Sequence, residues 1–186
     1  MKRLFDFLLA LFVAFVLALP ILIVAVVVRL TSSGPVLYWS DRVGRWNIIF
    51  RMPKFRTMQV GTPALATHLL SDPGQYLTPV GFFLRKSSLD ELPQLWSILI
   101  GDMSFVGPRP ALFNQDDLIV LRTCNGVDEL VPGLTGWAQV NGRDELSIQC
   151  KVQYDVEYLN KQSFWFDMKI LALTILKAVR REGVSH

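Results

Sequence analysis

The chain has 186 residues, of which 51% are hydrophobic and 19% charged, and its formal net charge is +3. This length predicts one domain, and the apolar content is sufficient for a hydrophobic core. A role in nucleic-acid binding is disfavoured because no basic stripe is interleaved with aromatic residues, whereas the positive charge suits an anionic membrane face. Cys124 and Cys150 lack CxxC spacing, so we expect buried, reduced thiols of a cytoplasmic chain.

An uncharged apolar segment runs from Phe7 to Val28 and is long enough to cross a bilayer as a helix. A secretory signal is disfavoured, because the segment is longer than a typical signal core and no small-x-small cleavage site follows it. Pro20 removes a backbone donor and predicts a kink near the middle. Basic residues flank both ends, which suits a hairpin that enters and leaves the same leaflet, although kinks also occur in spanning helices.

Short strands and a polar loop are expected next. The strand candidates are Val36–Ser40, Asn47–Arg51 and the residues around Phe55. The following segment, 61–75, reads as a surface loop, and its isolated His68 is not expected to bind a metal. Helices are expected at Pro93–Ile100, Phe113–Arg122, Tyr154–Asn160 and Phe164–Arg181. The last of these helices is basic and amphipathic, so it can pack on the core or lie in the membrane interface.

Two adjacent acids, Asp90 and Glu91, stand in an otherwise apolar segment. Neighbouring carboxylates cannot both be buried as free anions without compensating charge. A capping box, with Ser88 as N-cap and Glu91 three residues later, would explain them structurally, but Pro93 disfavours helical dihedral angles at the residue before it. If Pro93 instead opens the helix, the acids lie just ahead of its positive end, where phosphates bind.

Basic residues near the acid pair suit a phosphate ligand. Lys54, Arg85 and Arg109 are the candidates, because arginine offers paired donors to phosphate and lysine a compact charge. Pro108 and Pro110 stiffen the backbone around Arg109, for which a surface charge on a rigid turn is the alternative. Mg²⁺ held by one or both acids would neutralise a diphosphate.

A turn-rich segment, 132–143, contributes two further candidates. Asn141 and Arg143 could contact a nucleotide or phosphate, and the glycines of the segment permit close approach. A hairpin turn is the alternative explanation of Asn141-Gly142. Trp137 is expected to pack rather than to stack on a base.

Three blocks of sequence carry a family resemblance. They are Lys54-Phe55-Arg56-Thr57-Met58, the segment 84–110 with its S-L-D-E-L-P-Q setting around the acids, and the segment 132–143. Together they resemble the bacterial sugar transferases, the small monotopic phosphoglycosyl transferases that start glycan assembly on a lipid carrier. The resemblance extends from Lys2 to about His186.

This resemblance implies an α/β fold that is mainly α with a few short strands. Residues 1–30 would form a re-entrant membrane hairpin broken at Pro20, and residues 31–186 a catalytic domain on the cytoplasmic face of the bacterial inner membrane. The family usually places a serine before this proline, whereas this chain has Leu19, which leaves the break angle open.

The resemblance also implies a reaction. Asp90 would attack the diphosphate of a uridine-diphosphate sugar and keep the phospho-sugar, and a polyprenyl (undecaprenyl) phosphate would then accept it. Glu91 would hold Mg²⁺ or tune Asp90, and the partners would be the donor, the carrier, the bilayer and downstream glycosyltransferases. Two alternatives stay open: a membrane-bound metal-dependent phosphatase or pyrophosphatase, and a non-catalytic membrane scaffold. No motif identifies the sugar.

Overall fold

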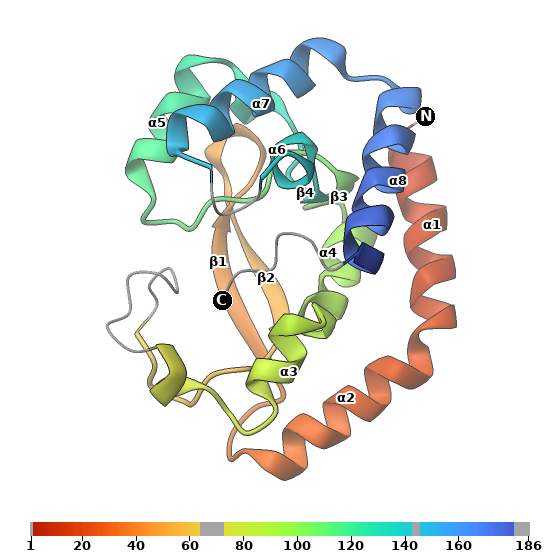
Figure 1. Ribbon diagram of the computed structural model, residues 1–186, viewed down its shortest axis with the longest axis vertical. Coiled ribbons are helices and arrows are strands. Elements are labelled where there is room, and N and C mark those ends of the chain that lie inside the picture. The colour runs from red at the N-terminus through yellow and green to blue at the C-terminus, as the bar shows by residue number, and fades with distance from the viewer. Residues whose placement is uncertain (1, 64–72, 143–145, 181–186) are drawn as a thin grey trace.

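A computed structural model describes residues 2–63, 73–142 and 146–180 (Figure 1). The helices are α1 Lys2–Val16, α2 Ala18–Thr31, α3 Gly81–Lys86, α4 Leu95–Ile100, α5 Asp116–Cys124, α6 Trp137–Val140, α7 Ile148–Lys161 and α8 Phe164–Arg180. The strands are β1 Leu37–Val43, β2 Ile49–Phe55, β3 Ser104–Val106 and β4 Gly133–Thr135. Short 3-10 helices are η1 Arg45–Asn47, η3 Pro73–Tyr76, η4 Leu89–Gln94 and η5 Val127–Glu129. The expectation of a mainly helical fold with a few short strands is confirmed.

The first two helices form a bent pair. The chain breaks at Leu17, and α1 and α2 are bent by 63° relative to each other. Pro20 lies in the first turn of α2 and has no N–H to donate to the carbonyl of Val16, four residues earlier. The break therefore precedes the proline by about one turn, where the hydrogen bond to the Val16 carbonyl is missing.

No single helix among the described residues is both long and apolar enough to span a bilayer, but α1 and α2 together meet these criteria. One side of the pair is exposed and apolar. Its largest exposed side chains are Leu4, Phe7, Leu8, Leu11, Phe12, Phe15, Leu19, Leu22, Ile23, Val26 and Leu30. Such a continuous apolar surface exceeds the scattered exposed residues found on ordinary soluble domains.

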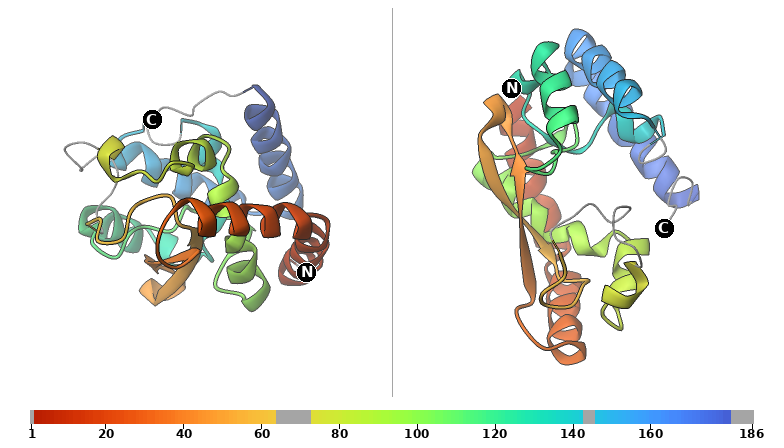
Figure 2. Two further views of the ribbon diagram at one scale, coloured as in Figure 1. Left: turned by 90° about the horizontal axis from the view of Figure 1, so that it is seen from below. Right: turned by 90° about the vertical axis from the view of Figure 1, so that its left-hand side faces the viewer.

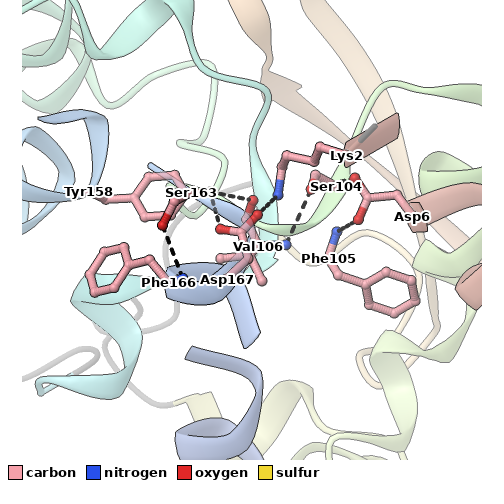
Figure 3. Close-up of polar contacts among 9 residues, drawn as sticks. All are labelled: Lys2, Asp6, Ser104, Phe105, Val106, Tyr158, Ser163, Phe166 and Asp167. Atoms are coloured by element: carbon pink, nitrogen blue, oxygen red, sulfur yellow. Dashed lines mark hydrogen bonds and ion pairs between the residues drawn. The ribbon is translucent and has the colours of Figure 1, made fainter. Parts of the chain in front are cut away.

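Buried polar contacts attach the other side of α1 to the rest of the chain (Figure 3). Asp6 is 4% exposed, and its carboxylate accepts a hydrogen bond from the Ser104 hydroxyl at 2.8 Å and another from a backbone amide of β3. Lys2 forms an ion pair with Asp167 of α8, and the second oxygen of Asp167 accepts the Tyr158 hydroxyl at 2.7 Å. Each buried acid is therefore hydrogen-bonded, as burial requires, and α1 is fixed to β3 and α8.

Seen from the front, the β1–β2 hairpin runs through the middle of the molecule (Figure 1). Seen from the side, in the right-hand view of Figure 2, it lies along one edge. The strands are antiparallel, with Leu37 opposite Phe55. Three short strands were predicted here, and the second and third form the single strand β2. It begins later than Asn47 because Trp46 and Asn47 lie in the connecting turn with φ of 57°. The buried face of β2 contributes Met52 to the central core and Phe55 to a cluster with α2.

Strands β3 and β4 pair in parallel, and glycines allow the neighbouring backbone segments to approach closely. A Cβ atom at Gly133 would lie 2.1 Å from the Gly107 amide nitrogen, and one at Gly136 would lie 2.1 Å from the Gly107 carbonyl oxygen. No side chain fits there. These two glycines of the segment 132–143 therefore serve the close packing of backbone on backbone.

Trp137 packs against helices α7 and α8, as predicted. Its indole N–H donates to Glu157 at 2.8 Å, and its ring lies 6.4 Å from that of Tyr154 and 5.0 Å from that of Phe166. Ring pairs at these separations stabilise a core beyond simple burial.

Several predicted details differ from the structure. Helix α7 begins at Ile148 rather than Tyr154, because the Ser147 hydroxyl accepts the amide of Cys150 and caps it. Cys150 and Cys124 are both exposed free thiols, so the expectation of burial is wrong; both lie near helix ends that face solvent. Helix α5 begins later than predicted, and His68 with most of its loop lies outside the described residues.

A buried ion pair joins α5 to α7, and we expect it to support the fold. Arg122 binds Asp155 Oδ2 through Nε and Nη2 at 2.9 and 2.7 Å, and Asp155 is 1% exposed. Removing one partner of such a pair leaves a buried charge uncompensated, so Asp155→Asn should lower the free energy of unfolding by about 3 kcal/mol in thermal unfolding. The exposed Lys161–Glu157 pair is the control, and Lys161→Gln should cost less than about 1 kcal/mol. Equally small losses would contradict the structural role of the buried pair.

Candidate active site

The two adjacent acids lie in η4, which continues directly into α4. The expectation that Pro93 opens this helix is wrong. Ser88 adopts the left-handed conformation, with φ of 57°, and starts the helical turn ahead of Asp90. The turn stays 3-10 as far as Gln94, as expected where proline interrupts the α-helical hydrogen-bond pattern.

The capping-box explanation of the acid pair is also wrong. Ser88 occupies the N-cap position of η4, but its side chain makes no capping hydrogen bond. The Glu91 carboxylate is bound to residues far away in sequence instead. Glu91 is therefore held by tertiary contacts and not by the local needs of a helix end.

Glu91 binds two cations through a single oxygen. Lys54 Nζ and Arg109 Nη2 each lie 2.8 Å from Glu91 Oε1. Burial alone would raise the pKa of Glu91, but Arg109 and then Lys54 outweigh it and hold that pKa far below its usual range. Glu91 is thus a permanent anion that brings together β2, η4 and the segment after β3. Its second oxygen, Oε2, has no partner within the described residues.

Asp90 has a different environment. It is 8% exposed, and its carboxylate makes no hydrogen bond or ion pair within the described part of the chain. Burial is the main influence on its pKa and raises it, opposed by the charge of Lys54 and, more weakly, by Arg85 and Arg109. Asp90 is therefore a partly desolvated carboxylate close to cations but committed to none of them.

Arg85 and Arg42 extend this group of cations. The Arg85 Nε donates to the Thr57 hydroxyl at 3.0 Å, and its charge acts on Asp90. The charges of Arg109 and Glu91 act on the pKa of Arg42 of β1, and its guanidinium binds the Pro110 carbonyl. Arg42 therefore lies at the same site. The sequence analysis did not identify Arg42, because in the sequence it is only one of the basic residues that flank the apolar segment. Ser40 and Arg42 lie two residues apart on β1 and so share a face, and this spacing could have indicated a polar site there.

The backbone around Arg109 is held at each residue. Arg122 donates to the Arg109 carbonyl at 2.8 Å, Arg42 donates to the Pro110 carbonyl at 3.2 Å, and the amide of Gly133 donates to the Pro108 carbonyl at 2.9 Å. The two prolines restrict φ in addition. The Arg109 side chain is 42% exposed yet anchored at its tip, which suits a group that meets a ligand.

The remaining predicted residues are not joined to the acids by the described contacts. The Asn141 amide donates to the Trp137 carbonyl at 2.8 Å and closes α6, so the Asn141-Gly142 pair ends a helix rather than forming a hairpin turn. Arg143 lies outside the described residues. Arg56, which belongs to the Lys54-Phe55-Arg56-Thr57-Met58 block, is 5% exposed and donates to the Ser33 carbonyl beyond α2.

A metal ion at this site would have few protein ligands. The described residues contain no group of three or more acids, histidines and cysteines that could hold one. The acid pair nevertheless offers a free carboxylate at Asp90 and a second oxygen on Glu91, and hard oxygen donors of this number suit Mg²⁺, which takes phosphate and water oxygens as its other ligands. The donor set therefore fits Mg²⁺ bound together with a phosphate-containing ligand.

Comparison with known proteins identifies the family of this chain. The family model for bacterial sugar transferase matches residues 1–181. The chain is 41% identical over 186 residues to the "Uncharacterized sugar transferase EpsL" of Bacillus subtilis, covering 100% of this chain and 91% of that protein.

Two other relatives have names that state a reaction. The chain is 36% identical to the UDP-glucose:undecaprenyl-phosphate glucose-1-phosphate transferase of Escherichia coli, covering 95% of this chain and 40% of that protein. It is 35% identical to the undecaprenyl-phosphate galactose phosphotransferase of Salmonella typhimurium, covering 98% and 41%. The chain thus spans about two fifths of the length of these two relatives. Because the family model and the Bacillus relative are each matched over nearly the whole chain, the chain belongs to the bacterial sugar transferases and is an enzyme.

Proposed function

We propose that this enzyme transfers a sugar 1-phosphate from a uridine-diphosphate sugar to undecaprenyl phosphate in two steps. In the first, an oxygen of Asp90 forms a bond to the phosphorus that carries the sugar, and the bond from that phosphorus to the bridging oxygen breaks. Uridine monophosphate leaves with the electron pair, and an aspartyl phospho-sugar stays on the enzyme. In the second, an oxygen of undecaprenyl phosphate attacks the same phosphorus, which frees the Asp90 carboxylate and gives the lipid diphosphate sugar.

The observation that carries this proposal is the contrast between the two acids. Glu91 is neutralised by Lys54 and Arg109, whereas Asp90 is buried without a partner in the described residues. A carboxylate that is already hydrogen-bonded is a poorer nucleophile. A carboxylate without hydrogen bonds becomes more nucleophilic when it is partly removed from water. The surrounding cations are placed to stabilise negative charge on the phosphate oxygens as the bond to uridine monophosphate breaks.

Mg²⁺ is proposed as the cofactor, held by Asp90 and the free oxygen of Glu91 together with phosphate oxygens. When bound, it would supply positive charge for the diphosphate and for the leaving uridine monophosphate. Lys54 and Arg109 hold Glu91 in place for this task and neutralise the remaining phosphate charge.

Helices α1 and α2 are proposed to form the re-entrant membrane hairpin. Support comes from their 63° bend, their exposed apolar side chains and the basic residues at both ends of the pair. A hairpin of this kind keeps residues 31–186 on the cytoplasmic face, where the phosphate of the lipid carrier lies at headgroup depth. The product would then pass to downstream glycosyltransferases.

The role of Asp90 can be tested with the donor alone. We expect the enzyme to release uridine monophosphate in about one equivalent and to gain the mass of a phospho-sugar, because the first step needs no acceptor. Asp90→Asn should abolish both signals, since the amide cannot attack phosphorus. Glu91→Gln is the comparison, and it should slow turnover with partial rescue by added Mg²⁺. A folded Asp90→Asn protein that still forms the adduct would refute the assignment, and release of free sugar phosphate without lipid would favour a hydrolase.

Metal dependence follows from the charge on the diphosphate. Chelation should reduce turnover to background, and Mg²⁺ should restore it, as measured by uridine monophosphate release across a panel of uridine-diphosphate sugars with a short polyprenyl phosphate. Full activity in excess chelator would show that Lys54, Arg85 and Arg109 neutralise the diphosphate unaided.

The topology can be tested by cysteine labelling. In a variant in which Cys124 and Cys150 are replaced by serine, one cysteine is added before Met1 and another replaces Val60, which is 71% exposed. Both sites should react with an impermeant reagent only from the cytoplasmic side of membrane vesicles. Labelling from opposite sides would show a spanning helix instead.

A further inference from the structure

Arg42 is a positive charge at the site that makes no ion pair with any acid of the described residues. Its Nε donates to the Ser40 hydroxyl at 3.0 Å and its Nη1 to the Pro110 carbonyl at 3.2 Å, and both acceptors are uncharged. It forms no ion pair within the described residues, and its Nη2 has no partner there. Arg122, whose side chain is 12% exposed, provides the contrast, because it forms an ion pair with Asp155.

The neighbouring charges make this imbalance greater. The charge of Glu91 acts on Arg42, but Glu91 Oε1 already binds both Lys54 and Arg109. Burial lowers the pKa of Arg42 to about 10, and the adjacent Arg109 contributes to this shift, so Arg42 is still charged at neutral pH. A partly buried guanidinium next to another cation is costly unless an anion joins them.

We propose that Arg42 is a phosphate-binding residue of this site, whose Nη2 donates to a phosphate oxygen of the ligand held beside Arg109. The inference deepens the proposed function and rests on it for the identity of the ligand. The phosphate can belong to the diphosphate of the sugar donor or to the phosphate of the lipid acceptor, and both offer the same oxygen acceptors to a guanidinium.

The geometry explains why an arginine is used. Nε binds the Ser40 hydroxyl of the same strand, Nη1 fixes the strand to the Pro110 carbonyl, and Nη2 is left for the ligand. Lysine has one nitrogen and cannot meet all three demands. Arg42 therefore acts as a structural contact for the Pro108–Pro110 segment and as a donor to the ligand.

A binding experiment tests the proposal without turnover. Inorganic pyrophosphate with Mg²⁺ is titrated against the full chain in detergent and followed by tryptophan fluorescence, with folding checked by thermal unfolding. Arg42→Gln should weaken binding by about tenfold or more, and Arg42→Lys by less, because only the fork is lost. The matched control is Arg51→Gln, which removes an exposed arginine of the same hairpin that lies over the Trp39 ring. Equal affinities of Arg42→Gln, Arg51→Gln and the unchanged chain would overturn the proposal.

Two half-reactions distinguish the source of the phosphate. If Arg42 binds the donor, Arg42→Gln should raise the donor concentration needed for adduct formation by about tenfold, with the acceptor requirement unchanged. If it binds the acceptor, adduct formation should be normal and the lipid requirement should rise. Pyrophosphate binding that depends on Arg42 in a chain without transfer activity would refute the transferase function and keep the phosphate site.

A double-mutant comparison separates direct binding from support of Arg109. If Arg42 only positions the Pro108–Pro110 segment, Arg42→Gln should have no further effect on pyrophosphate binding once Arg109 is changed to Gln. That result would overturn the proposal. An added loss of about tenfold in the Arg109→Gln background would establish that Arg42 contributes its own donor.

Discussion

The site depends on one shared oxygen, Glu91 Oε1, which binds Lys54 and Arg109 at equal distances. These two cations come from β2 and from the segment after β3, so a single carboxylate joins parts of the chain that are far apart in sequence. Each of the three groups is partly or largely withdrawn from water, and each alone would be costly to bury. Glu91 is therefore the residue that permits the cations to be close together, and the properties of Asp90 follow from this arrangement.

The architecture links the bent pair of apolar helices, α1 and α2, to the site through β3. Asp6 of α1 holds β3 by its side-chain and backbone donors, and Tyr158 donates to the carbonyl of Val106 at its end. The chain reaches Arg109 a few residues later. A displacement of α1 would thus act on the strand that leads to Arg109, and this explains why a helix with so apolar an outer face carries a fully bonded acid on its inner face (Figure 3).

The local patterns in the sequence predicted the elements better than they predicted the site. Apolar periodicity and turn residues located both strands of the hairpin and the C-terminal helices, because these signals act over short ranges. Pro20 identified the bent pair, although the break falls at Leu17. The sequence did not predict the left-handed conformation of Ser88, and it did not predict Arg42 at the site because the contact of Arg42 with the Pro110 carbonyl joins residues far apart in sequence.

The two acids also show why residue type alone does not assign a role. They are adjacent, yet burial raises the pKa of Asp90 while two bound cations lower that of Glu91. The short 3-10 turn directs neighbouring side chains to different surroundings, one toward paired cations and the other toward a place without a partner in the described residues. Within the described part of the chain, Arg42 adds a cation whose hydrogen bonds go to uncharged acceptors, and a phosphate of the proposed ligand would balance its charge. The proposed anionic ligand would thus provide for Arg42 the charge balance that Glu91 provides for Lys54 and Arg109.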